Sequence, residues 1–319
     1  MLFPRRPKSA ESEAARRERR NRDRRLFLLA LFVTAALLAL LMWLLLPAGD
    51  ADSRRITLER QMRALYAAWG VPLPGTPNLA DLDGLLAAKG MSLGAPIFMR
   101  IFKREFELEV WKRKGERFEH FATYPICRWS GRLGPKLATG DHQAPEGFYV
   151  VDKSALNPNS RWHRSFNLGF PNAFDRAHGR TGSFLMVHGG CSSVGCYAMT
   201  DTVIDEIWHI VTRAFDGGQK RFQVQVFPFR MTNDNLARYA GAPQATFWQN
   251  LKEGHDMFER DRIPPVVGVC GKTYGFQSGL QVPDLSGQLL ATCPRDGSRT
   301  RDRQSASSQF SNKSMTETP

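Results

Sequence analysis

The sequence predicts a mostly β domain with a few helices, of the α+β class, behind a single N-terminal transmembrane helix. Two observations lead to this prediction. Short runs in which apolar and polar residues alternate recur from residue 96 onward, and one long helical pattern interrupts them. Before them, Leu26–Leu46 is a run of 21 residues without a charge, and about 20 apolar residues in a helix span a bilayer core.

The basic residues of the chain are concentrated at its N-terminus. The formal net charge is +13, and the first 25 residues contain ten basic and four acidic side chains. Because basic residues that flank a membrane span stay in the cytoplasm, we expect 1–25 to be a cytoplasmic arm. Leu26–Leu46 is then a single-pass anchor in the inner membrane, and the rest of the chain is periplasmic. The arm lacks interleaved aromatic residues, which argues against nucleic-acid binding.

A cleaved secretory signal peptide is the alternative to an anchor. The small residues of segment 47–51 would suit a cleavage site. The apolar run is longer than the about 7 to 15 residues that are usual for the apolar region of a signal peptide, which favours the uncleaved anchor.

Residues 47–92 are predicted to form membrane-proximal helices and a linker. Apolar residues recur at helical spacing from Ile56 to Trp69, until glycine and proline interrupt the pattern in segment 70–75. Asn78 is predicted to cap a second, short helix, which ends at Gly90.

Residues 93–280 are predicted to form one β-rich domain. Its first element is a hairpin of strands at 97–102 and 106–111, joined by Lys103–Glu105. Further strands are expected at 117–126, 147–151, 183–188, 222–229 and 266–270. Helices are expected at 201–215 and, more briefly, near 233–239 and 244–252. Segment 281–319 is rich in Ser, Thr, Arg and Asp and is predicted to be a disordered tail.

The residues with the clearest chemistry lie between 179 and 201. A short apolar run places His188 at the end of a predicted strand, and two glycines allow a sharp turn after it. Cys196 follows, a few residues before the helix that begins at Asp201. A nearby imidazole or a helix N-terminus lowers the pKa of a thiol. A cysteine, a histidine base and nearby backbone N–H groups are together sufficient for acyl transfer.

The five cysteines allow other interpretations. An odd number in an exported chain indicates a free thiol or an intermolecular bond. Cys191 and Cys196 could form a disulfide, or Cys196 could be a buried structural thiol. Zinc binding by His188, Cys191 and Cys196 is disfavoured, because structural zinc usually takes four closely spaced ligands. Pairing of Cys270 with Cys293 and of Cys127 with Cys191 would leave Cys196 alone, but the sequence does not decide the pairing.

The segment from His188 to Asp201 resembles the catalytic motif of the YkuD-type L,D-transpeptidases, and above all their YafK-like branch. It reads His-Gly-x-Cys-x-Ser-Val-Gly-Cys-x-Ala-Met-Thr-Asp. The resemblance covers roughly Leu93 to Tyr274. Val194 replaces the second histidine of the wider family, and Tyr197–Met199 replaces its arginine-containing tripeptide; both departures agree with the YafK-like branch. Supporting blocks occur in order at 124–127, 134–136, 140–141, 145–149, 157–160, 174–182 and 227–230.

The resemblance implies a YkuD-like catalytic domain and a role for each matched residue. Cys196 would be the nucleophile and His188 its base. The backbone N–H groups of Gly195 and Cys196 would stabilise the oxyanion, and the carbonyl of Gly189 would orient His188. No cofactor and no metal site are predicted.

Several residues around the motif are candidate substrate contacts. Arg176 and Arg180 could hold carboxylates of a diaminopimelate-containing stem peptide, and a structural ion pair with Asp175 is the equal alternative. The further candidates are His178, Tyr197 and Ser193.

The implied reaction is cysteine-dependent acyl transfer on peptidoglycan stem peptides. Cys196 would attack the carbonyl between meso-diaminopimelate and the fourth residue, which releases D-alanine and forms a thioester. A diaminopimelate amine would then give a 3-3 cross-link, and an amine of an outer-membrane lipoprotein or another envelope protein would tether that protein to the wall. Water as acceptor would make the chain a hydrolase that releases a wall-linked protein. A non-catalytic peptidoglycan-binding module is the alternative of another class, against which the intact pair of Cys196 and His188 argues.

Overall fold

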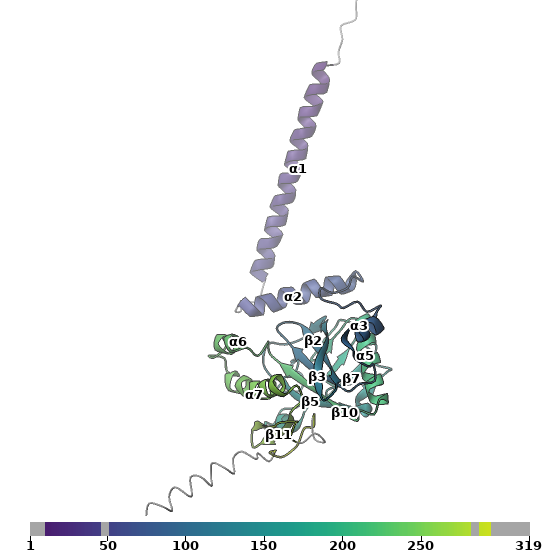
Figure 1. The fold of residues 1–319 in the computed structure, drawn as a ribbon. Helices are drawn as coiled ribbons and strands as arrows, with labels where there is room; N and C mark the ends of the chain where they lie inside the picture. Colours follow the sequence, from purple (N-terminus) through teal and green to yellow (C-terminus); the bar gives the residue numbers. More distant parts are fainter. Residues whose placement is uncertain (1–9, 46–50, 282–286, 295–319) are drawn as a thin grey trace, which may run out of the picture. The chain divides into compact units, whose positions relative to one another are not determined.

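The computed structural model describes residues 10–45, 51–281 and 287–294, and Figure 1 shows its fold. The chain divides into two units, 1–57 and 58–319. The first contains helix α1 (Ala10–Leu45) and the first turns of α2 (Ala51–Ala68). By length and composition, Arg16–Met42 of α1 could cross a membrane, and a signal sequence near an N-terminus passes the same test.

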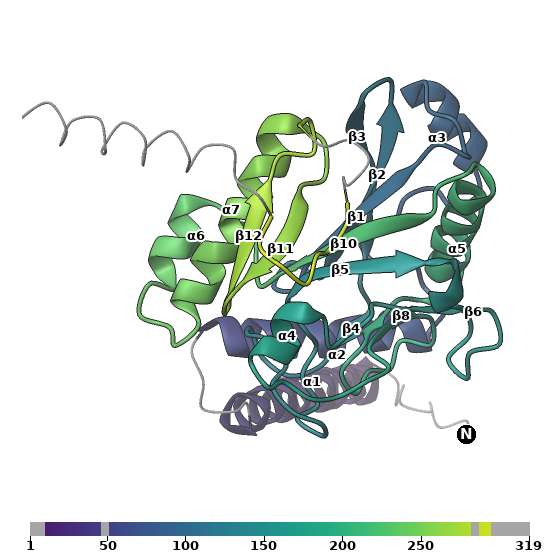
Figure 2. The ribbon, with the colours of Figure 1, turned by 90° about the horizontal axis from the view of Figure 1, so that it is seen from below.

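The second unit confirms the predicted α+β class. It contains two five-stranded sheets and a separate hairpin (Figures 1 and 2). In order across the first sheet, the strands are β3 (Arg117–Pro125), β2 (Glu107–Lys114), β1 (Ile97–Phe102), β10 (Arg221–Phe227) and β5 (Gly147–Asp152). Across the second they are β4 (Arg128–Trp129), β9 (Tyr197–Ala198), β8 (Met186–His188), β7 (Ser165–Asn167) and β6 (Leu156–Asn157). The hairpin pairs β11 (Val266–Cys270) with β12 (Thr273–Gln277).

Helices surround these sheets. Beyond α2, the described helices are α3 (Leu82–Lys89), a one-turn 3₁₀ helix η1 (Lys153–Ala155), α4 (Ala173–Ala177), α5 (Asp201–Asp216), α6 (Asn233–Arg238) and α7 (Ala245–Asp261). The apolar face predicted for α5 is buried in the core, because Val203, Ile204, Ile207 and Val211 all point inward. Helix α7 continues nine residues beyond the predicted end at 252.

The first sheet packs between α7 on one face and α5 on the other. On one face, Phe98 of β1 packs on Phe258 of α7, with ring centroids 4.4 Å apart. On the other face, Phe222 of β10 contacts Phe215 of α5 and Phe166 of the second sheet, each at 5.8 Å. The second sheet and α5 therefore pack on the same face of the first sheet. The motif residues Val187 and Tyr197 of the second sheet are fully buried.

Two predicted strand starts and one predicted helix cap are also wrong. The second hairpin strand begins at Glu107, not 106, because Phe106 adopts φ +56° in the turn. The strand predicted from 183 begins at Met186, after Phe184 at φ +56°. The short helix α3 is capped by Asp81, whose side chain accepts from the N–H of Gly84, and not by Asn78.

The predicted disordered tail falls largely on 282–286 and 295–319, which lie outside the described residues. Within 287–294, Leu289 pairs with Val267 of β11, and Cys293 forms a disulfide with Cys270. This short segment therefore runs along the β11–β12 hairpin.

Candidate active site

His188 and Cys196 lie on neighbouring parallel strands of the second sheet. The register pairs Val187 with Tyr197 and His188 with Ala198, and both Val187 and Tyr197 are fully buried. Side chains alternate between the two faces of a strand. Cys196, one residue before β9, and His188 are therefore on the same face of this sheet, opposite the face that carries Val187 and Tyr197.

One ring nitrogen of His188 is held by the backbone. Its Nδ1 donates to the carbonyl of Gly189 at 2.5 Å, because the carbonyl can only accept. In the neutral ring this contact leaves Nε2 without a proton. Trp162 stacks against the ring, with centroids 6.3 Å apart and an interplanar angle of 28°. Burial lowers the pKa of His188, and the bond to Gly189 opposes that shift.

Cys196 is the free cysteine of the chain, and it is partly buried. The N–H of Met186 donates to Sγ at 3.4 Å, and Sγ lies 3.6 Å from the carbonyl oxygen of Phe184. Burial raises the pKa of the thiol, while the Met186 N–H and the Lys136 ammonium lower it. The groups that favour the thiolate therefore come from β8 and Lys136.

Disulfides occupy the other four cysteines. Cys127 is bonded to Cys191, and Cys270 to Cys293. A Cys191–Cys196 disulfide is thereby excluded, and Cys191 is not available as a zinc ligand. Among the described residues, no group of three or more His, Cys, Asp or Glu side chains is arranged to hold a metal ion.

The loop before Cys196 is held by two serines. The N–H of Gly195 donates to Ser130 Oγ at 2.5 Å, and Ser193 Oγ donates to the carbonyl of Cys196 at 2.7 Å. Gly195 has φ +113°, a conformation that favours glycine. The resemblance implies that the Gly195 N–H donates to the oxyanion. In this structure the same N–H donates to Ser130 Oγ.

Sequence reasoning missed Ser130. It lies 65 residues from Gly195 along the chain and belongs to no part of the motif. No pattern in the sequence points to it, since only the pairing of β4 with β9 brings the two segments together.

The predicted substrate contacts differ in burial and in their hydrogen-bond partners. Arg180 forms a buried ion pair with Asp175 at 2.8 Å, the structural alternative for this residue. Tyr197 is fully buried, and its hydroxyl donates to the carbonyl of Pro145 at 2.6 Å. Arg176 is exposed and bonds the carbonyl of Pro171, while His178 Nε2 lies 2.9 Å from the carbonyl oxygen of Lys272. Ser193 lies in the loop before Cys196 and donates to the Cys196 carbonyl.

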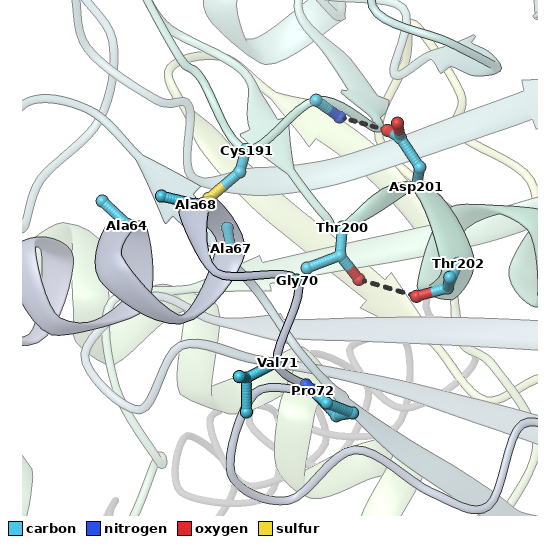
Figure 3. Close-up of a pocket in the computed structure, with 11 residues that line it drawn as sticks. Ala64, Ala67, Ala68, Gly70, Val71, Pro72, Cys191, Thr200, Asp201 and Thr202 are labelled. Carbon is cyan, nitrogen blue, oxygen red and sulfur yellow. Dashed lines mark hydrogen bonds between the residues drawn. The ribbon is translucent and has the colours of Figure 1, made fainter.

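A pocket of about 520 Å³ adjoins the other end of the motif loop (Figure 3). Its walls come from the end of α2 with the linker after it, and from the start of α5 with Gly190 and Cys191. Asp201 accepts from the N–H of Gly190 at 2.7 Å beside it. The residues that form its walls include neither His188 nor Cys196, so we assign it no role in the reaction.

Comparison with known proteins identifies the family. No family model matches the chain. The chain is 47% identical over 203 residues to "Putative L,D-transpeptidase YafK" of Escherichia coli, in strain K12 and in O157:H7, and the match covers 64% of this chain and 82% of each relative.

Two solved structures are similar at lower levels. The helical cell shape determining protein Pgp2 from Campylobacter jejuni is 17% identical, over 58% of this chain and 66% of that chain, with a TM-score of 0.34. Bdellovibrio bacteriovorus Bd1075 is 21% identical, over 52% of this chain and 62% of that chain, with a TM-score of 0.30. These two similarities are too low to bear on function. On the strength of the 47% identity to the curated relatives, the chain belongs to the YafK-like family of L,D-transpeptidases.

Proposed function

We propose that the chain is a periplasmic, membrane-anchored enzyme that transfers acyl groups of peptidoglycan stem peptides through a thioester on Cys196. Family membership supports peptidoglycan as the substrate. The observation that carries the mechanism is the placement of a free thiol and of a histidine with fixed Nδ1 on one face of β8 and β9.

The proposed first step is the formation of the thioester. The thiol is protonated at neutral pH, because burial raises its pKa, so His188 Nε2 takes its proton as Sγ attacks the carbonyl carbon. The C=O electron pair moves onto oxygen, and a tetrahedral intermediate forms. Its collapse breaks the C–N bond, and His188 returns the proton to the leaving amine.

An amine or water resolves the thioester in the second step. A diaminopimelate amine gives a 3-3 cross-link, and an amine of an envelope protein gives a protein–wall link. Water gives hydrolysis. Of the two candidate arginines, Arg180 is paired with Asp175, so we assign the contact with a substrate carboxylate to Arg176, which is exposed on α4.

The proposed topology follows from α1. Arg16–Met42 is apolar enough to cross a membrane, and the basic residues before Leu26 favour a cytoplasmic N-terminus. The two disulfides of the second unit agree with an oxidising compartment on the other side.

Mass spectrometry of the full chain in detergent after treatment with a carbapenem tests the nucleophile. We expect one covalent adduct, and none on Cys196→Ala. An equal adduct on Cys196→Ala would exclude Cys196 as the nucleophile.

Incubation with purified muropeptides, with and without a lipoprotein-linked species, tests the acceptor. The appearance of 3-3 dimers supports transpeptidation, and release of protein from the linked species supports hydrolysis. If neither product forms while Cys196 is acylated, the peptidoglycan assignment is wrong.

A further inference from the structure

Ser130 directly follows β4, the strand that pairs with β9, and the proposed nucleophile Cys196 directly precedes β9. The β4–β9 register pairs Arg128 with Ala198 and Trp129 with Tyr197. Extending this register by one residue beyond the two strands brings Ser130 opposite Cys196. Residues directly opposite each other in an antiparallel pair have side chains on the same face, with Cβ atoms about 4.5–5.5 Å apart. The half-buried Ser130 hydroxyl therefore shares the face that carries Cys196 and His188.

The hydrogen bonds around Ser130 leave its own proton weakly engaged. Its oxygen accepts from the N–H of Gly195 at 2.5 Å. Ser193 uses its proton on the carbonyl of Cys196 at 2.7 Å, so in the contact between the two hydroxyls Ser130 is the donor. That contact measures 3.3 Å, beyond the usual O–H···O range of about 2.5–3.0 Å.

The segment around Ser130 is held by partners outside the motif. The N–H of Ala144 donates to the carbonyl of Ser130 at 3.0 Å. Arg60 of α2 donates to the next carbonyl, that of Gly131, at 2.8 Å, and its guanidinium lies 4.2 Å from the ring centroid of Trp129. These contacts fix the backbone at Ser130 before the reaction, so that only the hydroxyl proton has to turn as charge develops.

We propose that the Ser130 hydroxyl is a catalytic hydrogen-bond donor to the oxygen that becomes negative when Cys196 attacks. It rests on the proposed function, since it needs Cys196 as nucleophile. The Gly195 N–H, bonded to Ser130 Oγ, polarises this hydroxyl and acts through it. The proton leaves the long contact with Ser193 for the oxyanion, because hydrogen bonds to charged acceptors are roughly twice as strong as neutral ones. It stays on Ser130 throughout, and no bond of the serine is broken.

Two reactions of the same thiol separate this role from a positional one. Acylation by a carbapenem passes through a tetrahedral oxyanion. Alkylation by iodoacetamide does not, because Sγ displaces iodide in one step. An oxyanion donor therefore affects the first rate and not the second, whereas a residue that only positions Cys196 affects both.

The experiment measures both rates by mass spectrometry on the full chain in detergent. Ser130→Ala should lower the acylation rate by about 100-fold, the usual effect of removing one oxyanion donor, and change alkylation by less than about twofold. Ser130→Thr keeps a hydroxyl and should recover most of the acylation rate. Ser154→Ala, an exposed serine at η1, is the matched control and should change neither rate.

Each other outcome overturns the proposal. Unchanged acylation of Ser130→Ala means that the hydroxyl donates nothing to the intermediate. Equal losses of both rates mean that Ser130 only positions the thiol, and failure of Ser130→Thr to recover acylation means that the hydroxyl is not the active group. An adduct that persists on Cys196→Ala defeats the proposed function itself, so the two failures are distinguishable.

Discussion

The disulfide between Cys127 and Cys191 joins the segment between β3 and β4 to the loop that follows His188. Both cysteines also bond the backbone after Cys196. The N–H of Cys127 donates to the carbonyl of Ala198 at 2.8 Å, and that of Cys191 donates to the carbonyl of Met199 at 3.1 Å. The bridge therefore holds the segments on both sides of the candidate nucleophile.

Removing this bridge should impair both stability and chemistry. For Cys127→Ala/Cys191→Ala we expect a loss of about 2–5 kcal/mol in the free energy of unfolding, since the bond closes a loop of 64 residues. The freed loop should also slow carbapenem acylation. Urea denaturation and adduct formation measure the two effects.

The second disulfide is the matched control. Cys270→Ala/Cys293→Ala removes a bond between residues 23 apart at the β11–β12 hairpin. It should lower stability and leave the acylation rate of the folded chain unchanged. An equal loss of rate in both double variants would refute a specific role for the Cys127–Cys191 bond.

The pH dependence of acylation should reflect the buried His188. Because burial lowers the pKa of His188, the ring stays neutral, and able to accept a proton, below its ordinary value of about 6.5. The acid limb of the acylation rate should therefore have its midpoint below that pH. The midpoint is measured from carbapenem acylation rates at a series of pH values from about 4 to 9, the range in which His and Cys titrate.

Trp162 provides a control for this assignment. Trp162→Ala removes the ring that stacks on His188 and lets water reach the imidazole. The pKa of His188 should then rise, and the acid limb should move to higher pH. An unchanged limb would assign it to another group.

Alkylation of Cys196 should keep rising into alkaline solution. Burial raises the pKa of this thiol, so less thiolate is present at neutral pH than for an ordinary cysteine, whose pKa is about 8.5. The iodoacetamide rate should thus not level off near neutrality. Lys136→Met should shift the rise to still higher pH, because the Lys136 ammonium lowers the pKa of the thiol.

Lys103 and Glu146 should be sensitive to substitution. Both are fully buried and paired at 2.9 Å, and the ammonium also donates to the carbonyls of Arg132, Gly134 and Ala144. Lys103→Met leaves the Glu146 carboxylate buried without its counter-ion and should cost about 3–5 kcal/mol of unfolding free energy. Urea denaturation measures the loss. Lys103→Met/Glu146→Gln should recover part of it, and a double variant no more stable than the single one would contradict this explanation.

Arg180 and Arg176 should behave differently. Arg180→Ala leaves Asp175, which also caps α4, buried without its partner and should lower the melting temperature. Arg176 is exposed, so Arg176→Ala should leave the melting temperature within about 2 °C, as surface substitutions usually do, and raise the KM for a muropeptide. An unchanged KM would remove Arg176 from the substrate site.

Much of the fold could be predicted because the signals are local. The β1–β2 hairpin and α5 follow from alternation and helical spacing within single segments. The two strand starts were misplaced because Phe106 and Phe184 adopt positive φ, which neither residue type signals. The short strands β4, β6, β7 and β9 were not predicted, because two or three residues carry no periodicity. The five-residue strand β12 was not predicted either.

The sequence by itself determined the family and the candidate pair of Cys196 and His188, because the motif that carries them is contiguous from 188 to 201. Only the tertiary structure decided the pairing of the cysteines, the burial of Arg180 against Asp175, and the bond between Gly195 and Ser130. The two longest of these contacts join residues 64 and 65 positions apart. Strand pairing creates such contacts, and the hydrogen-bond partners of a backbone N–H depend on that pairing and not on the neighbouring sequence.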